Sequence, residues 1–461
     1  MVGGHLTYYT SWTVWRRGQW NFINSFREDL PDWTTLPGLF LENGGLAYGS
    51  GKTYHPKIPP YYDGNKSWSA AALPYFNPCW NTADDPTIPP FFQDGGLPCV
   101  PCVVDIEHYV FGKPISVATE MCETDAYEDT LTIERAVQFL QSAASSGKQW
   151  YLGVGLHKPH LPFQAAPEDW ALHPLNSSTL PTHPLPPVGM PDVAFHFSEA
   201  AAHSNPWQPL PDNDTLAARR GYAAAATGMD RKLGVLMQAL DKLGLANSTA
   251  VVLHSDHGWQ LGEHGEWRKM TNFELATRVP LIIRAPWITG PSAGGRRASG
   301  LVELVDIMPT IAELAGVAMP AGKTYDGTSL VPLLRNGSAA VKSTAFSQYP
   351  RHVTNPAAAW DNNSILRCPR SNFTHMGYSV RTQDWRYTEW VRWNGTSLTP
   401  LWDEVAGREL YDHRGEPLFP VDFNRYENVN VANVTANAGV VDALSKLLRE
   451  GFPSTPAVAS L

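Results

Sequence analysis

The chain has 461 residues, of which 43% are hydrophobic and 17% are charged, and its formal net charge is −9. This length and composition predict a globular protein of two domains rather than a disordered chain. The acidic balance and the lack of a basic run argue against nucleic-acid binding. No apolar stretch is long enough to span a membrane.

The first segment of the chain predicts one helix followed by a polar turn. Residues 35–45 have the pattern of an amphipathic helix that stops at Asn43-Gly44. The sequence Ser50-Gly-Lys-Thr-Tyr-His-Pro56 comes next, and taken alone its Lys52 is a solvated lysine on a turn. Residues 57–130 are rich in Pro and Asp, and we predict a long loop over one end of a sheet.

Four of the five cysteines lie in this loop. Cys99 and Cys102 form Cys-Val-Pro-Cys, but a zinc site of this type needs a second pair, and the sequence has none. The alternative is a disulfide, which requires an oxidising compartment. Its partners would be drawn from Cys79, Cys99, Cys102 and Cys122.

The middle of the chain alternates helix and strand patterns, as expected of an α/β fold. Apolar residues spaced i, i+3, i+4 and i+7 from Ile133 predict an amphipathic helix, and residues 150–156 predict a buried strand. That strand leads into His157-Lys-Pro-His160-Leu-Pro-Phe163, where His157 comes at the carboxyl end of the strand. His160 stands among prolines, and we interpret it as structural.

A Pro-rich loop over residues 164–212 precedes a long predicted helix over residues 214–243, which Gly244 ends. One stripe of this helix is apolar and contains two methionines. At this spacing it predicts core packing rather than a cofactor site. The stripe consists of Tyr222, Met229, Leu233, Leu236, Met237 and Leu240.

Two short runs at residues 250–253 and 279–283 are rich in Val and Ile and predict buried parallel strands. The polar block between them follows the carboxyl end of a strand, where open α/β sheets keep their ligand sites. Asp256 and His257 could converge on one metal ion if Gly258 opens a turn, although an isolated Asp-His-Gly is usually only a turn. Lys269 could hold an anionic substrate.

The last part of the chain predicts a small α+β domain. Residues 377–382 and 385–391 alternate with period two and form a predicted hairpin, residues 408–412 add a strand, and residues 440–448 close with a helix. We place the domain boundary at residue 340, which gives domains of 1–340 and 341–461. An apolar segment at 301–314 precedes the boundary.

Several of these motifs together resemble the sulfatase family. Its His-Lys-Pro-His-x-Pro-Phe corresponds to residues 157–163, its Gly-Lys-x-x-His-Pro to residues 51–56, and its Ser-Asp-His-Gly to the region around Asp256. Within the family, the match is closest to the branch that acts on 2-sulfated iduronate in glycosaminoglycans. The resemblance spans most of residues 8–450 and is weakest at the two predicted loops.

The resemblance implies both a fold and a chemistry. The fold is an alkaline-phosphatase-like, mostly parallel sheet sandwiched by helices, with a smaller C-terminal α+β domain that has an antiparallel sheet. The chemistry is sulfate-ester hydrolysis, in which a formylglycine made from a cysteine attacks sulfur and a metal, usually Ca²⁺, neutralises the sulfate.

The resemblance also implies roles for individual residues. Asp256 and His257 would be metal ligands, although a histidine is unusual for Ca²⁺, which prefers oxygen ligands. The catalytic residues would be Lys52, His55, His157 and Lys269. The residues in contact with the sulfated carbohydrate would be Lys52, His157, Trp259 and Lys269.

Two family motifs do not occur in this sequence. One is an early Asp-Asp pair that completes the metal site, and the other is Cys-x-Pro-Ser-Arg, whose cysteine becomes the nucleophile. Cys368-Pro-Arg-Ser371 has the wrong order and lies in the C-terminal domain, so we reject it. We therefore expect that this N-terminal segment is missing, that the chain as given is inactive, and that a formylglycine-generating enzyme acts on the complete protein.

Nine Asn-x-Ser/Thr sequons predict passage through the secretory pathway and a lysosomal or secreted protein. The N-terminus has no basic head followed by an apolar stretch, so it is not a signal peptide. The sequons begin at Asn65, Asn176, Asn213, Asn247, Asn336, Asn362, Asn372, Asn394 and Asn433.

Two other classes of protein fit the same motifs. A phosphatase or phosphodiesterase of the same superfold would carry Ser or Thr at the missing nucleophile position. A non-catalytic relative would bind sulfated glycans without turnover.

Overall fold

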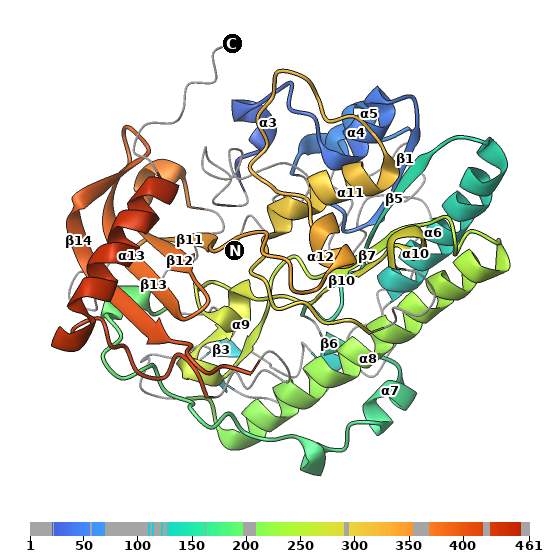
Figure 1. The fold of residues 1–461 in the computed structure, drawn as a ribbon. Coiled ribbons are helices and arrows are strands. Elements are labelled where there is room, and N and C mark those ends of the chain that lie inside the picture. Colours follow the sequence, from blue (N-terminus) through green and yellow to red (C-terminus); the bar gives the residue numbers. More distant parts are fainter. Residues whose placement is uncertain are drawn as a thin grey trace.

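The computed structural model describes residues 21, 23–55, 58–69, 109–110, 113–114, 121–122, 127–161, 163–196, 209–289, 295–353, 368–417 and 425–452. In Figure 1 the C-terminal strands gather on one side, and the long helices and the N-terminal helices lie on the other. Most of the loop predicted at 57–130 lies outside the described residues.

Strand β1 (Leu46–Gly51) runs parallel to β5 (Trp150–Gly155), with Leu46 opposite Trp150 and Gly51 opposite Gly155. The predicted helix before β1 is α4 (Leu36–Glu42), which Thr35 caps by accepting a hydrogen bond from the Gly38 N–H. Gly51 has φ +70°, and a Cβ there would lie 2.3 Å from the Gly155 carbonyl oxygen. Only glycine fits this close approach. The pairing of β1 with β5 places Lys52 and His157 at neighbouring strand ends.

Helices α4 and α6 (Tyr127–Ser146) pack on these strands, and α8 (Asp212–Lys242) packs against α6. The sequence predicts all three helices. The most buried face of α8 carries small residues, among them Ala218, Gly221 and Ala224. The apolar stripe predicted on α8 lines a cavity rather than a filled core.

Strand β7 (Val251–His254) pairs with β10 (Leu281–Arg284), and the two run antiparallel, with Leu281 opposite His254. The prediction of two buried parallel strands is therefore wrong for β10. The connecting segment leaves the carboxyl end of β7 and returns to that same end. Strand β10 therefore runs alongside β7 in the opposite direction. Ile282 on β10 is 60% exposed.

The connection between β7 and β10 holds four short elements, which are β8 (Gln260–Leu261), η6 (Glu263–Gly265), β9 (Trp267–Arg268) and α9 (Glu274–Thr277). Elsewhere the structure has α3 (Phe26–Asp29), η1 (Pro60–Asp63), α5 (Gly64–Ser67), β2 (Tyr109–Val110), β3 (Lys113–Pro114), β4 (Met121–Cys122), β6 (Phe163–Gln164), α7 (Pro167–Ala171), η4 (Leu175–Ser177), η5 (Asp192–Ala194), α10 (Pro286–Thr289), η7 (Leu304–Asp306), α11 (Ile307–Ala315), α12 (Val331–Arg335), η9 (Arg370–Asn372) and η10 (Thr435–Asn437).

The C-terminal sheet is antiparallel in the order β11 (Ala345–Arg351), β12 (His375–Arg381), β13 (Trp385–Asn394) and β14 (Thr399–Asp412), with α13 (Ala438–Gly451) beside it. The predicted hairpin is β12 and β13, and the predicted last strand is part of the longer β14. Strand β11 was not predicted. The boundary at residue 340 stays a prediction.

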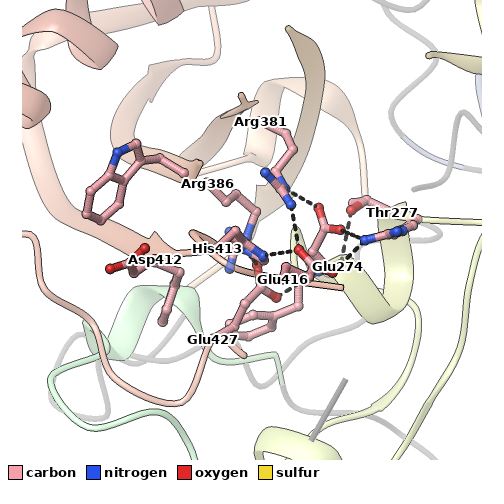
Figure 2. Close-up of polar contacts among 12 residues, drawn as sticks. Glu274, Thr277, Arg381, Arg386, Asp412, His413, Glu416 and Glu427 are labelled. Carbon is pink, nitrogen blue, oxygen red and sulfur yellow. Dashed lines mark hydrogen bonds and ion pairs between the residues drawn. The ribbon is translucent and has the colours of Figure 1, made fainter. Parts of the chain in front are cut away.

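A buried ionic network connects α9 to this sheet (Figure 2). Arg381 bonds Glu274 of α9 at 3.0 Å and Glu416 at 2.9 Å, and Arg386 pairs with Glu427. The backbone N–H of Glu274 donates to Glu427 at 2.8 Å. The network therefore ties the segment that follows Lys269 to the C-terminal sheet.

His413 lies at the centre of this network. Its Nδ1 is 2.9 Å from Glu416 Oε2, and its Nε2 is 3.2 Å from Glu427 Oε1. Burial lowers the pKa of His413, but the hydrogen bonds to Glu416 and Glu427 outweigh burial and raise the pKa above its ordinary value. The positive charges of Arg381, Arg386 and Arg278 also face the cluster, and the Tyr426 ring stacks on the imidazole.

We expect this histidine to make the stability of the protein depend on pH. A raised folded-state pKa contributes stability that is complete below the unfolded pKa of about 6.5 and is lost as pH rises through the folded value. The free energy of unfolding, measured by denaturant titration at several pH values, should fall over that window. The fall should be smaller in His413→Gln, and an identical fall in both proteins would assign it to other groups.

Candidate active site

Segments that follow three strands meet at one cavity of about 1010 Å³. Lys52 follows β1, His157 and His160 follow β5, and Asp256 and His257 follow β7. All five line this cavity, and so does Trp259. Lys269 joins them through a 2.9 Å contact between its Nζ and His160 Nε2. His55 forms a backbone bridge with Ile58 and is not among the described residues that line the cavity.

The cavity lies between the two strand pairs of the α/β part. Residues 148–160 around β5 and 248–259 around β7 line it, with α8 and α11 supplying apolar side chains. Within the described residues, β5 pairs with β1 alone and β7 with β10 alone. Facing edges of β5 and β7 therefore border the cavity, and the polar residues sit where the strands end.

His160 connects the other polar groups of the site. Its ring stacks on that of His157 with centroids 5.0 Å apart, and it meets the Trp259 ring edge-on at 5.0 Å. Its Nδ1 is 2.9 Å from the Leu161 carbonyl, which can only accept, so Nδ1 donates and Nε2 accepts from Lys269. The interpretation of His160 as merely structural is too narrow, because this residue holds Lys269 in place.

Burial shifts the pKa of both groups in the same direction. It lowers the pKa of Lys269 well below its usual value, and nearby Lys52 adds to the effect. It also lowers the pKa of His160 well below its usual value, and Lys269 adds to it. Burial lowers the pKa of Lys52 as well, although the charges of Asp256 and Asp129 oppose it. Titratable groups whose pKa is shifted by burial and by a neighbouring charge are typical of functional sites.

Asp256 and His257 contact each other through Oδ2 and Nε2 at 3.3 Å. His257 Nδ1 is 2.9 Å from the Gly258 carbonyl and must donate to it, so Nε2 of the neutral ring is an acceptor. Two acceptor atoms this close favour a proton or a cation between them, so the pair fits two ligands of a metal ion. Within the described part of the chain, no group of three or more His, Cys, Asp or Glu residues forms a metal site.

Three further residues, which the sequence did not single out, also reach the site. Lys158 lines the cavity, and Glu128 and Asp129 of α6 contact His157 and Lys158. The signal available in the sequence was weak, because an acidic pair in the first turn of a helix is ordinary.

The model of the family described as "Sulfatase" matches residues 52–317, which is more than half of the chain. The chain belongs to the sulfatase family. Human iduronate 2-sulfatase is 32% identical over 459 residues, which cover 89% of this chain and 79% of that protein. The choline-sulfatase of Rhizobium meliloti is 31% identical over 49% of this chain and 43% of its own length.

Two solved structures share the fold. A phosphonate monoester hydrolase from Silicibacter pomeroyi has a TM-score of 0.65 and 20% identity, over 99% of this chain and 87% of that one. A protein solved with its substrate D-glucosamine-2-N,6-O-disulfate has a TM-score of 0.57 and 18% identity, over 97% of this chain and 87% of that one. The sulfatase assignment and the alkaline-phosphatase-like α/β fold are thus confirmed, and the family supports hydrolysis of sulfate esters on sugars.

The remaining sequence predictions fall partly outside the described residues. Cys79, Cys99 and Cys102 lie there, as does the side chain of Cys122, so the disulfide stays a prediction. Cys368 is buried in the apolar cluster of the C-terminal sheet, with its Sγ 3.3 Å from His352 Nδ1. Asn362 lies outside the described residues, Asn394 is half-buried and the other seven sequon asparagines are exposed. No described helix is long and apolar enough to cross a membrane.

Proposed function

We propose that this chain removes sulfate from 2-sulfated iduronate in a glycosaminoglycan, as the main part of a complete sulfatase. The observation that supports the proposal is the convergence of Lys52, Lys269 and His157 at the strand ends, in the family whose curated members include iduronate 2-sulfatase. Buried cations with few waters around them stabilise the charge of a sulfate ester as its bond breaks.

The residues of this chain divide into three roles. Lys52 and Lys269 hold the sulfate, and His160 orients Lys269. His157, and His55 if the sugar reaches it, donate a hydrogen bond or a proton to the leaving sugar oxygen. The Trp259 ring lies 5.4 Å from Lys269 Nζ and forms a wall for the sugar.

Asp256 and His257 would hold a divalent metal, for which Ca²⁺ is our proposal. Such an ion supplies Lewis-acid neutralisation of the sulfate oxygens. Two protein ligands are few for Ca²⁺, which takes six to eight oxygens, so further ligands from outside the described residues are part of the proposal.

The nucleophile is proposed to be a formylglycine on a segment outside this sequence. Such a segment would enter the gap between β5 and β7, because the polar end of this gap coincides with the cluster of site residues. A formylglycine-generating enzyme would make the aldehyde. Cys368 is not proposed, because it packs in the C-terminal cluster.

Calorimetric titration tests the substrate class without requiring turnover. We expect a 2-sulfated iduronate disaccharide to bind at least about tenfold more tightly than its unsulfated form, which is about 1.4 kcal/mol. A phosphate monoester of the same sugar is the control. Equal affinity for sulfated and unsulfated sugars would contradict the proposal, and preference for the phosphate ester would favour a phosphatase.

We also propose a lysosomal or secreted location, and glycosylation tests it. Secreted from a eukaryotic host behind a supplied signal peptide, the protein should carry N-glycans on several sequons. Asn247 is the best candidate, because it is exposed in the turn between α8 and β7. Deglycosylation should lower the mass, and Asn247→Gln should remove one glycan. An unchanged mass would count against the secretory pathway.

A further inference from the structure

We infer that Lys158 is a positioning residue, which donates a hydrogen bond to Nδ1 of His157 and so places the ring proton on Nε2. Nothing in the family match assigns this lysine a role. The catalytic meaning of that proton rests on the proposed function, whereas the hydrogen bond itself does not.

The ammonium group of Lys158 is fully enclosed, with only 1% of its side chain exposed. Its Nζ lies 3.2 Å from His157 Nδ1, 3.4 Å from Glu128 Oε1 and 3.5 Å from the His160 carbonyl. An ammonium has three hydrogens and no lone pair, so it can only donate. Buried polar groups are almost always hydrogen-bonded, and these three acceptors surround the Lys158 nitrogen.

The backbone that carries both residues is also fixed. Asp129 accepts the backbone N–H of His157 on Oδ1 at 2.7 Å and that of Lys158 on Oδ2 at 3.0 Å. Asp129 is buried on α6, and Ser50 ties the same turn of α6 to β1 by donating to the Thr132 carbonyl at 2.9 Å. The two side chains therefore start from a turn that is held at both of its amides.

Glu128 offers the competing arrangement, because its Oε1 is 3.4 Å from His157 Nδ1. If Nδ1 carried the proton and donated to Glu128, Nδ1 would have no lone pair for the ammonium 3.2 Å away, and two donor nitrogens would be in contact. With Lys158 as donor, the shortest contact joins a donor to an acceptor, and the ammonium also lies 3.4 Å from Glu128 Oε1, so one cation bridges the two acceptors Nδ1 and Oε1 and Glu128 balances the lysine charge. Burial first, and Lys158 second, lower the pKa of His157 well below its usual value, in keeping with a neutral ring.

This tautomer matters for the proposed reaction, because a group that assists a leaving oxygen must present a hydrogen to it. A ring protonated on Nδ1 would present a lone pair from Nε2 instead. Lys158 would therefore decide whether His157 acts as a donor or an acceptor toward the substrate.

Nitrogen-15 NMR of histidine-labelled protein at neutral pH tests the inference directly. The His157 signals are assigned by their loss in His157→Gln. We expect the native ring to be neutral, with Nδ1 bare and Nε2 protonated. Lys158→Met should move the proton to Nδ1, toward Glu128, while Lys66→Met, at an exposed lysine, should change nothing. A native ring protonated on Nδ1, or an unchanged tautomer in Lys158→Met, would overturn the inference.

Glu128→Gln keeps the test decisive if Lys158→Met fails to fold. It preserves the lysine donor, so Nδ1 should stay bare, and a proton on Nδ1 in this variant would overturn the inference. In the complete enzyme, Lys158→Met should lower kcat by about 10²-fold with little change in KM. The NMR result stands whether or not the enzyme hydrolyses sulfate, so failure of the proposed function would be seen separately.

Discussion

Lys269→Ala is expected to lower kcat/KM for sulfate-ester hydrolysis by about 10²–10³-fold in the complete enzyme, without unfolding it. The side chain is buried, and its Nζ is fixed 2.9 Å from His160 Nε2 and over the Trp259 ring. Such a cation needs no reorganisation as the transition state forms. Removing one such interaction costs about 2.7–4 kcal/mol.

Stability should respond differently from activity to this change. Burial lowers the pKa of Lys269 because the charged form is poorly solvated, so removing the charge relieves that cost. We expect the melting temperature of Lys269→Ala to stay close to that of the native protein. Lys242→Ala on the exposed end of α8 is the matched control and should leave kcat/KM unchanged. Native kcat/KM in Lys269→Ala would remove Lys269 from the site.

Local features of the sequence were enough to predict α4, α6, α8, α13 and the C-terminal hairpin, but not the shorter helices. Thr35 and Asn43-Gly44 bound α4 through capping preferences that act over a few residues. The 3.6-residue period predicts α6 and α8, and alternation predicts β12 and β13. The pairing direction of β10 could not be predicted, because the path of the connection after β7 determines it.

We predicted the candidate site from motifs, and this prediction missed residues that reach the site from distant segments of the chain. His157, Asp256 and Lys269 stand in motifs, so sequence alone singled them out. Glu128 and Asp129 act on a turn 28 and 29 residues further along the chain, and nothing local marks that contact. The same limit applies to the cavity, which lies between two separate strand pairs, β1 with β5 and β7 with β10.

The largest effect we expect is that residues 1–461 alone do not hydrolyse sulfate esters, whereas a form that also carries the family's nucleophile segment does. In the proposed mechanism the nucleophile is absent from this sequence, and covalent catalysis then has no attacking group. Among the described residues, Asp256 and His257 are the only ligands that we propose for the metal, and two are too few for firm binding of a hard cation.

The cavity gives a second, structural reason for the same result. It borders edges of β5 and β7 and the apolar stripe of α8, and such edges and faces promote association between chains. We expect residues 1–461 to be poorly soluble, and a segment that fills the gap to raise both solubility and melting temperature. An insertion of the same length and shuffled sequence should do neither.

Both forms would be expressed with the formylglycine-generating enzyme and assayed on 4-methylumbelliferyl sulfate and on a sulfated-iduronate disaccharide, with Ca²⁺ supplied. Asp256→Ala in the extended form should abolish turnover, and Cys368→Ala should leave it unchanged, because Cys368 packs in the C-terminal cluster. Turnover by residues 1–461 that disappears in Cys368→Ala would show that the nucleophile lies in this chain after all. Glycan binding without turnover in the extended form would instead favour the non-catalytic relative.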